Sequence, residues 1–200
     1  MAGERLVAHS LAETYLYLMV TPCADCSKGP LNGSDAVTAT GESSAFRVEI
    51  DVTCGQCDWQ SRFSFRLPHG TGVEQGTGLP TLNPTDDPSG IIDAGQWLTL
   101  FRVITAKAAE TSDKADARLL GLEAAQCLEE ALKFYEQDND LPPPGSCFVE
   151  SSRRRLADHP QEFSRQRLLD LRAKLPNLSL MRARARQDAR PAKRRWWQRR

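Results

Sequence analysis

The sequence lacks any long apolar run. No stretch approaches the roughly 18 consecutive apolar residues that a membrane helix needs. The apolar run Tyr15–Val20 is too short for the apolar core of a secretory signal, and Glu4, His9 and Glu13 interrupt its surroundings. Six cysteines in 200 residues are too few for a disulfide scaffold. We therefore expect a soluble, cytoplasmic protein with reduced thiols and no transmembrane segment.

The sequence also has few motifs typical of enzymes. The Gly/Pro-rich stretch 68–90 contains no Gly-Lys-Ser/Thr, which argues against a phosphate-binding loop. Its three histidines, His9, His69 and His159, show no ligand spacing with one another or with a cysteine pair. No nucleophile–base motif is evident, so we predict no catalytic residue. An enzyme of unknown class built on the helical half stays open as an alternative.

The net charge of zero conceals a strong asymmetry. Residues 181–200 hold eight Arg and one Lys against one Asp, a net charge of +8. The remaining 180 residues hold 17 Lys and Arg against 25 Asp and Glu, a net charge of −8. This division indicates either a polyanionic partner for the basic tail or docking of the tail on its own acidic body.

The cysteines form two Cys-x-x-Cys pairs. Cys23 and Cys26 form the first pair, and Cys54 and Cys57 form the second, with 27 residues between the pairs. Two residues between thiols allow one tight turn to present both sulfurs to one ion, and two such turns complete a tetrahedron. We predict that these four residues bind a metal.

The second pair lies between two segments with strand-like alternation. Apolar residues alternate with polar ones over 46–53 and again over 59–67, which predicts a β-hairpin turning at Cys54–Cys57. The predicted register places Val48 opposite Phe63 and Glu49 opposite Arg62.

Two cysteine pairs, one of them at the tip of a hairpin, resemble a zinc ribbon over residues 15–67. The resemblance implies a structural Zn²⁺ held by four sulfurs. Zinc ribbons often carry glycine after the second cysteine of each turn, whereas Ser27 and Asp58 stand there. Rubredoxin has a similar ligand layout, so a rubredoxin-like iron electron carrier is the alternative, with iron less favoured than zinc.

The second half of the sequence is predicted to be helical. Asp93 and Gln96 form a capping box before one helix, and Ser112 could open a second helix that ends before Pro142. A short helix is expected between Phe148 and Ala157, and another begins at Pro160. Residues 10–20 fit a helix or a strand, with a slight preference for a helix.

These patterns predict an α+β protein. Its expected parts are a zinc-ribbon-like metal-binding region (1–67), a Gly/Pro-rich linker or extended loop (68–90), a helical region (91–180) and a disordered basic tail (181–200). We predict a non-enzymatic zinc-binding adaptor that interacts with protein or nucleic acid. Its protein partner is unknown, and any nucleic acid would bind nonspecifically through the tail.

The tail combines arginines, which suit phosphates, with two tryptophans, which can stack on bases. The candidate nucleic-acid-binding residues are Arg182, Arg184, Arg186, Lys193, Arg194, Arg195, Trp196, Trp197, Arg199 and Arg200. Deleting residues 181–200 should abolish a salt-dependent binding of DNA or RNA, measured by fluorescence anisotropy. Equal binding by the full-length and truncated proteins at low salt would show that the tail is not the contact.

Overall fold

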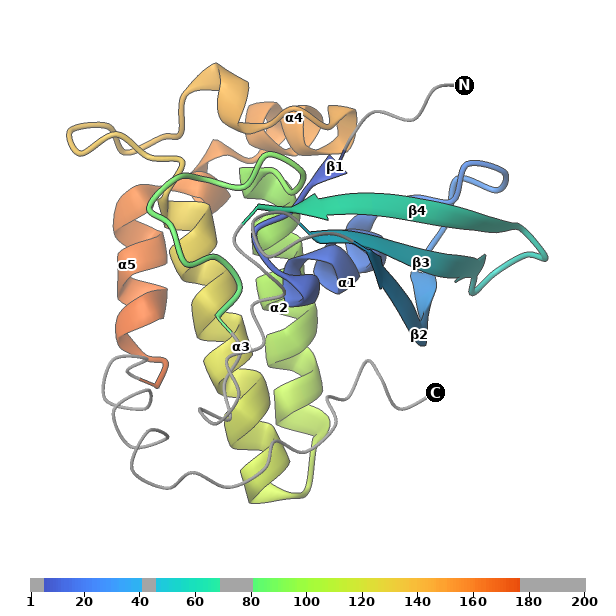
Figure 1. Cartoon of the computed structure of the whole chain (residues 1–200). Helices are drawn as coiled ribbons and strands as arrows, with labels where there is room; N and C mark the ends of the chain where they lie inside the picture. Colours follow the sequence, from blue (N-terminus) through green and yellow to red (C-terminus); the bar gives the residue numbers. More distant parts are fainter. Residues whose placement is uncertain (1–5, 41–45, 69–80, 177–200) are drawn as a thin grey trace. The chain divides into compact units, whose positions relative to one another are not determined.

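A computed structural model describes residues 6–40, 46–68 and 81–176 of the chain (Figure 1). The described residues divide into two compact units: unit 1 ends at Thr85, and unit 2 begins at Asp86. Within the described residues, strands make up one sheet in unit 1 and five α-helices are distributed over both units, so the predicted mixture of α and β structure is confirmed. None of the described helices is long and apolar enough to cross a membrane.

Unit 1 contains a four-stranded sheet. Its strands are β1 (Leu6–Val7), β2 (Leu31–Thr40), β3 (Phe46–Cys54) and β4 (Gln60–Leu67). Their order across the sheet is β1-β4-β3-β2, with β1 parallel to β4 and the other pairs antiparallel.

Helix α1 (Leu11–Val20) packs on the sheet and settles the ambiguity of residues 10–20 in favour of a helix. The Ser10 side chain caps the helix by accepting a hydrogen bond from the Glu13 N–H. At Gly33 of β2 an added Cβ would lie 3.0 Å from side-chain atoms of Tyr15 and Leu18, so the absence of a side chain there lets α1 approach closely.

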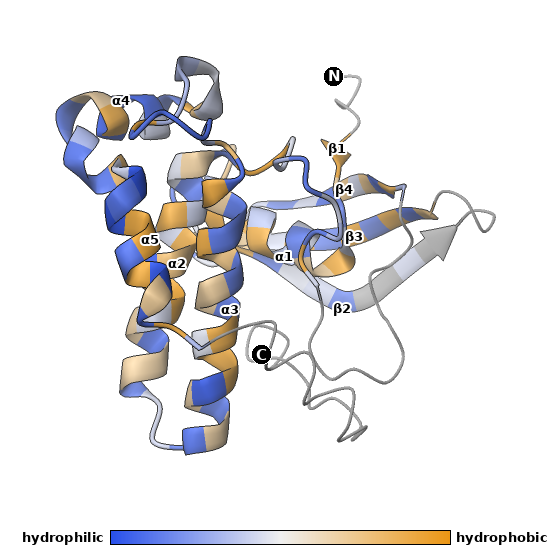
Figure 2. Ribbon diagram, turned by 90° about the vertical axis from the view of Figure 1, so that its left-hand side faces the viewer, coloured by the Kyte–Doolittle hydropathy of each residue, from blue (hydrophilic) through white to orange (hydrophobic). Residues whose placement is uncertain are grey.

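The core of unit 1 follows the alternation of its strands. Val48, Ile50 and Val52 of β3 are buried, whereas the intervening residues are exposed or half-buried. Figure 2 shows both hydrophobic and hydrophilic residues on the ribbon of β3. Phe65 of β4 lies on the same face, where the Tyr17 ring of α1 meets it edge-on at 5.8 Å between ring centroids. The predicted assignment of faces is therefore confirmed.

The predicted pairing of the two alternating segments is also confirmed, but its register is wrong by two residues. Val48 lies opposite Phe65 rather than Phe63, and Glu49 lies opposite Ser64 rather than Arg62. The reason is the length of the turn, because the Cys54 N–H donates to the carbonyl of Trp59 and so adds two residues to it. A register shift of two residues keeps every side chain on the same face of the sheet, so the predicted faces are correct although the register is not.

Unit 2 is helical. Its α-helices are α2 (Ala94–Glu110), α3 (Lys114–Leu132), α4 (Glu150–Asp158) and α5 (Arg165–Ala173), and its 3₁₀ helices are η1 (Pro144–Ser146) and η2 (Pro160–Phe163). Helices α2 and α3 run side by side, and α5 packs against α3 (Figure 1). Their core includes the fully buried side chains of Trp97, Leu100, Ile104, Leu122, Leu128, Phe163 and Leu168.

Three predicted helix boundaries differ from the structure. Helix α3 begins after Asp113 rather than Ser112, because the Asp113 carboxylate accepts from the first N–H groups of the helix. It ends at Leu132, well before Pro142. Beyond this end, the Asp140 carboxylate accepts a hydrogen bond from the Gln166 N–H at the start of α5. The helix predicted from Pro160 is divided, since Ser164 caps a new helix after the 3₁₀ turn.

The Asp93 carboxylate joins two helices of unit 2 through hydrogen bonds. The predicted capping box is confirmed: its carboxylate accepts from the Gln96 N–H at 2.8 Å, and the Gln96 side chain accepts from the Asp93 N–H at 3.0 Å. The same buried carboxylate accepts from the Val149 N–H at 2.9 Å and from the Ser152 hydroxyl at 2.7 Å. Asp93 therefore fixes the start of α4 against the start of α2.

Replacing Asp93 with Ala should destabilise unit 2 far more than the loss of a simple helix cap would. Its loss leaves buried donors unpaired, at a cost on the order of 3 kcal/mol. Asp113→Ala is the matched control, because this exposed residue caps α3 and its loss should cost about 1 kcal/mol. Urea unfolding measures both, and equal losses would contradict the role of Asp93 as a tertiary junction.

Candidate metal centre

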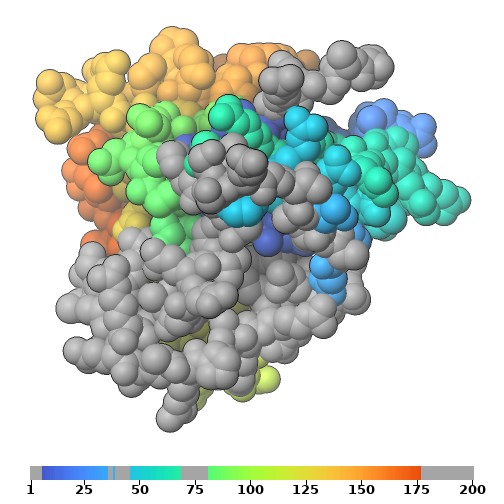
Figure 3. All heavy atoms as spheres, viewed as in Figure 1, coloured from blue at the N-terminus to red at the C-terminus, as the bar shows by residue number. Residues whose placement is uncertain are grey.

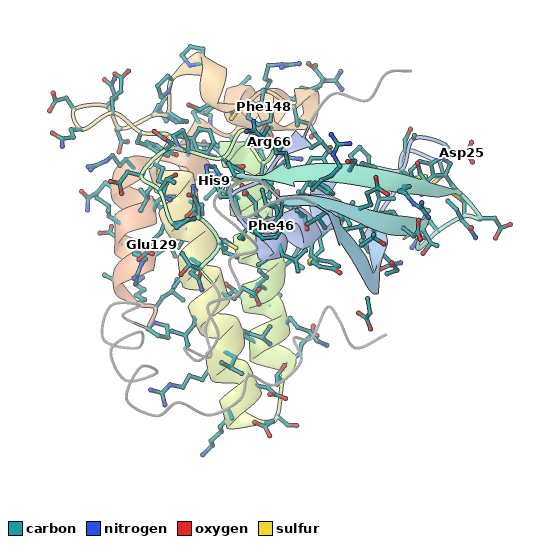
Figure 4. The ribbon with its side chains drawn as sticks, viewed as in Figure 1. His9, Asp25, Phe46, Arg66, Glu129 and Phe148 are labelled. Atoms are coloured by element: carbon teal, nitrogen blue, oxygen red, sulfur yellow. The ribbon has the colours of Figure 1, made fainter. Side chains whose placement is uncertain are left out.

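The two cysteine pairs lie in two loops at the same end of the sheet of unit 1. The first loop joins α1 to β2 and carries Cys23 and Cys26. The second loop joins β3 to β4 and carries Cys57, whereas Cys54 is the last residue of β3. Figure 4 places Asp25 of the first loop at the end of the sheet where β3 and β4 meet. The space-filling view shows the atoms of the two loops next to each other (Figure 3).

The four sulfurs form one cluster. They all lie within 4.8 Å of one another, and the Sγ atoms of Cys23 and Cys57 and those of Cys26 and Cys54 are 3.7 Å apart. A tetrahedral ion with metal–sulfur bonds of about 2.3 Å would separate its ligand sulfurs by about 3.8 Å. The cluster therefore matches the size of a single tetrahedral metal site, as the sequence predicted for these four residues.

The two loops, which we call the first and second knuckle (Cys23–Lys28 and Cys54–Trp59), share two hydrogen bonds. In each, the N–H of the first cysteine donates to the carbonyl five residues later, at 2.6 Å to Lys28 and 2.9 Å to Trp59. In each, the N–H two residues later donates to the sulfur of that cysteine, at 3.4 Å from Asp25 and 3.3 Å from Gln56. These N–H groups stabilise negative charge on the sulfurs.

The residue after the second cysteine differs between the knuckles. Ser27 has a φ of 56°, in the left-handed region that favours glycine. The resemblance to zinc ribbons leads us to expect glycine at this position. Asp58, at the corresponding position, does not have a positive φ. The departure from glycine therefore strains the first knuckle and not the second.

Backbone contacts join the second knuckle to the residues that follow the first knuckle. The Gly55 N–H donates to the Pro30 carbonyl at 3.1 Å, and Leu31 of β2 pairs with Cys54 of β3. A Cβ at Gly55 would lie 3.2 Å from the Asn32 side chain and 3.3 Å from the Pro30 carbonyl. The glycine between the two cysteines is the signal in the sequence that could have indicated this close approach.

The sulfurs of the second knuckle have opposite pKa shifts. The Gln56 N–H is the main cause that lowers the pKa of Cys54 to about 7. The Trp59 N–H acts to lower the pKa of Cys57, but burial and the neighbouring cysteine sulfurs outweigh it and raise that pKa to about 12. Four thiolates at these distances repel one another, so full ionisation of the cluster requires a cation among them.

The remaining cysteines have a different environment. Cys127 and Cys147 are buried in unit 2. Burial raises the pKa of both thiols, well above the usual range for Cys127 and to about 11 for Cys147. They are therefore far less reactive than exposed thiols.

Within the described part of the chain, neither His9 nor His159 adds a ligand to the cluster. The His9 ring lies 3.2 Å from the Glu13 carboxylate, and His159 follows α4 in unit 2. His69 and all the predicted nucleic-acid-binding residues of the tail lie outside the described residues.

The chain matches no protein-family model, no curated protein and no solved structure. Its function is therefore inferred from the cysteine cluster and from the sequence.

The strain at Ser27 predicts opposite effects of glycine in the two knuckles. Ser27→Gly should stabilise the protein by roughly 0.5–1 kcal/mol, because it removes the cost of a left-handed backbone. Asp58→Gly should destabilise it by a similar amount, because glycine increases the conformational entropy of the unfolded chain and relieves no strain in the folded one. Thermal and urea unfolding measure both, and a destabilising Ser27→Gly would contradict the assigned conformation of the first knuckle.

Proposed function

We propose that Cys23, Cys26, Cys54 and Cys57 hold one structural Zn²⁺, and that the protein is a non-enzymatic adaptor built around it. The observation that carries the proposal is the cluster of four sulfurs, drawn from two loops with matching hydrogen bonds. Thiolates are the ligands typical of structural zinc sites. The N–H groups of Asp25 and Gln56 orient and stabilise two of these thiolates.

Four sulfur ligands favour a structural role over a catalytic one. A catalytic zinc keeps one position open for water or substrate, whereas four cysteines fill a tetrahedron. The contribution of the ion is therefore to the folding free energy of unit 1. It would link the α1–β2 loop to the β3–β4 turn, which are joined otherwise by strand pairing and the Gly55–Pro30 hydrogen bond.

Iron in the same four ligands is the alternative, and it would make the protein a rubredoxin-like electron carrier. Sulfur ligation alone does not separate the two metals. Zinc is favoured because rubredoxin usually stands as a compact module, whereas here the knuckles belong to a chain of 200 residues with a second, helical unit. An iron site would colour the purified protein red, so visible absorbance distinguishes the two.

The remaining parts complete the proposal. Residues 1–67 form the metal-binding region, 68–90 a connection, 91–180 a helical region that docks a protein partner, and 181–200 a basic tail that contacts nucleic acid. A reducing compartment such as the cytoplasm suits thiols that bind a metal. Support for a docking role comes from large apolar side chains of the helical region that are at least 40% exposed, namely Val103, Leu119, Leu141 and Phe148.

Metal analysis tests the proposal directly. Protein purified without added metal should contain about one zinc per chain and little iron. Cys57→Ser should lower the zinc content and the stability of unit 1, because the ion loses a ligand. The far-UV helical signal should largely persist, because most of the helices belong to unit 2.

Cys127→Ser is the matched control, because it also removes one cysteine but lies outside the cluster. It should leave the zinc content unchanged. A metal-free protein whose thermal unfolding is the same with and without a chelator would refute the proposal.

A further inference from the structure

We infer that the cysteine cluster is also an oxidation site for peroxide, at which two disulfides form across the knuckles, Cys23–Cys57 and Cys26–Cys54. This inference rests on the proposed function, because the same thiolates serve as the metal ligands. It adds a reaction of the site with an oxidant to its structural role.

Two sulfur–sulfur contacts between the knuckles define these pairs. The Sγ atoms of Cys23 and Cys57 and those of Cys26 and Cys54 are each 3.7 Å apart. A disulfide needs about 2.05 Å between sulfurs, so each pair must close by less than about 2 Å. The two pairs share no cysteine, so both bonds can form in one molecule.

Each pair combines one accessible and one protected residue. Cys57 and Cys26 are half-buried, whereas Cys23 and Cys54 are only 2% and 8% exposed. An oxidant in solution therefore reaches Cys57 and Cys26 first. The buried partner across the cluster is in position to complete the disulfide before further oxidation occurs.

The chemistry balances with hydrogen peroxide as the oxidant. The thiolate of Cys26 attacks one peroxide oxygen, the O–O bond breaks, and after protonation the products are a sulfenic acid and water. The Cys54 thiolate then attacks the Cys26 sulfur, forms the S–S bond and expels hydroxide, which takes a proton to become water. The Cys23–Cys57 pair is oxidised by the same two steps. Over both pairs, four thiolates and two peroxides consume four protons and give two disulfides and four waters, which leaves the site without thiolate ligands.

Disulfides between the two knuckles have a structural consequence that disulfides within each knuckle lack. Cys23 and Cys26 belong to the α1–β2 loop, whereas Cys54 and Cys57 flank the β3–β4 turn. Disulfides between the loops replace the link that the metal provides, so the oxidised protein should stay folded without metal. Disulfides within each Cys-x-x-Cys pair would leave the loops without a covalent link.

Peptide mapping after peroxide treatment tests the inference. Trypsin cleavage after Arg5, Lys28, Arg47 and Arg62 places Cys23 and Cys26 in one peptide (6–28) and Cys54 and Cys57 in another (48–62). Disulfides across the knuckles join the two peptides, whereas disulfides within them leave two separate peptides, each lighter by two hydrogens. Zinc release is followed in parallel with a chromogenic chelator.

We expect four thiols lost and one zinc released for every two peroxides consumed, with the two peptides joined and reversal by dithiothreitol. Fragmentation of the joined peptides should show Cys23 bonded to Cys57 and Cys26 bonded to Cys54. Buried Cys127 and Cys147 should stay reduced and serve as internal controls. In Cys57→Ser, the Cys26–Cys54 bond alone should form.

Separate, internally oxidised peptides, or sulfinic acid at Cys57 without a disulfide, would overturn the inference. So would zinc that stays bound at a tenfold excess of peroxide. The zinc content of the untreated protein is measured first, so that a metal-free preparation counts against the proposed function alone. Joined peptides would support the inference even then.

Discussion

The repulsion among four closely spaced sulfurs is the constraint on which unit 1 depends. Two loops far apart in sequence bring four thiols within 4.8 Å of one another, and the neighbouring cysteine sulfurs help to raise the pKa of Cys57. N–H groups from Asp25 and Gln56 offset part of the negative charge. A divalent cation with four sulfur ligands would remove the rest of the repulsion and would link α1, β2 and the β3–β4 turn.

This link suits a unit with a small core. One face of the sheet and the helix α1 that packs on it supply most of the buried side chains of unit 1, and small domains commonly need a metal or disulfide in addition to their apolar core. Unit 2 has a different basis. Its helices bury an extended apolar core around Trp97, and the Asp93 carboxylate joins α2 to α4 through hydrogen bonds.

The sequence predicted what depends on local pattern and missed what depends on contacts between distant residues. The spacing of the cysteines identified the cluster, and alternation identified the buried faces of β3 and β4. The register was missed because the hydrogen bond from Cys54 to Trp59 lengthens the turn. The capping box of Asp93 is local and was found, but its contacts with Val149 and Ser152 lie 56 and 59 residues away in sequence and left no pattern. The left-handed backbone of Ser27 was missed because serine does not indicate it.

X-ray absorption at the zinc edge of the purified, reduced protein tests the central claim most directly, because it reports the atoms bound to the ion. We expect a single shell of four sulfurs at about 2.3 Å, with no nitrogen or oxygen ligand. A shell containing nitrogen or oxygen, or fewer than four sulfurs, would contradict a closed structural site made by Cys23, Cys26, Cys54 and Cys57.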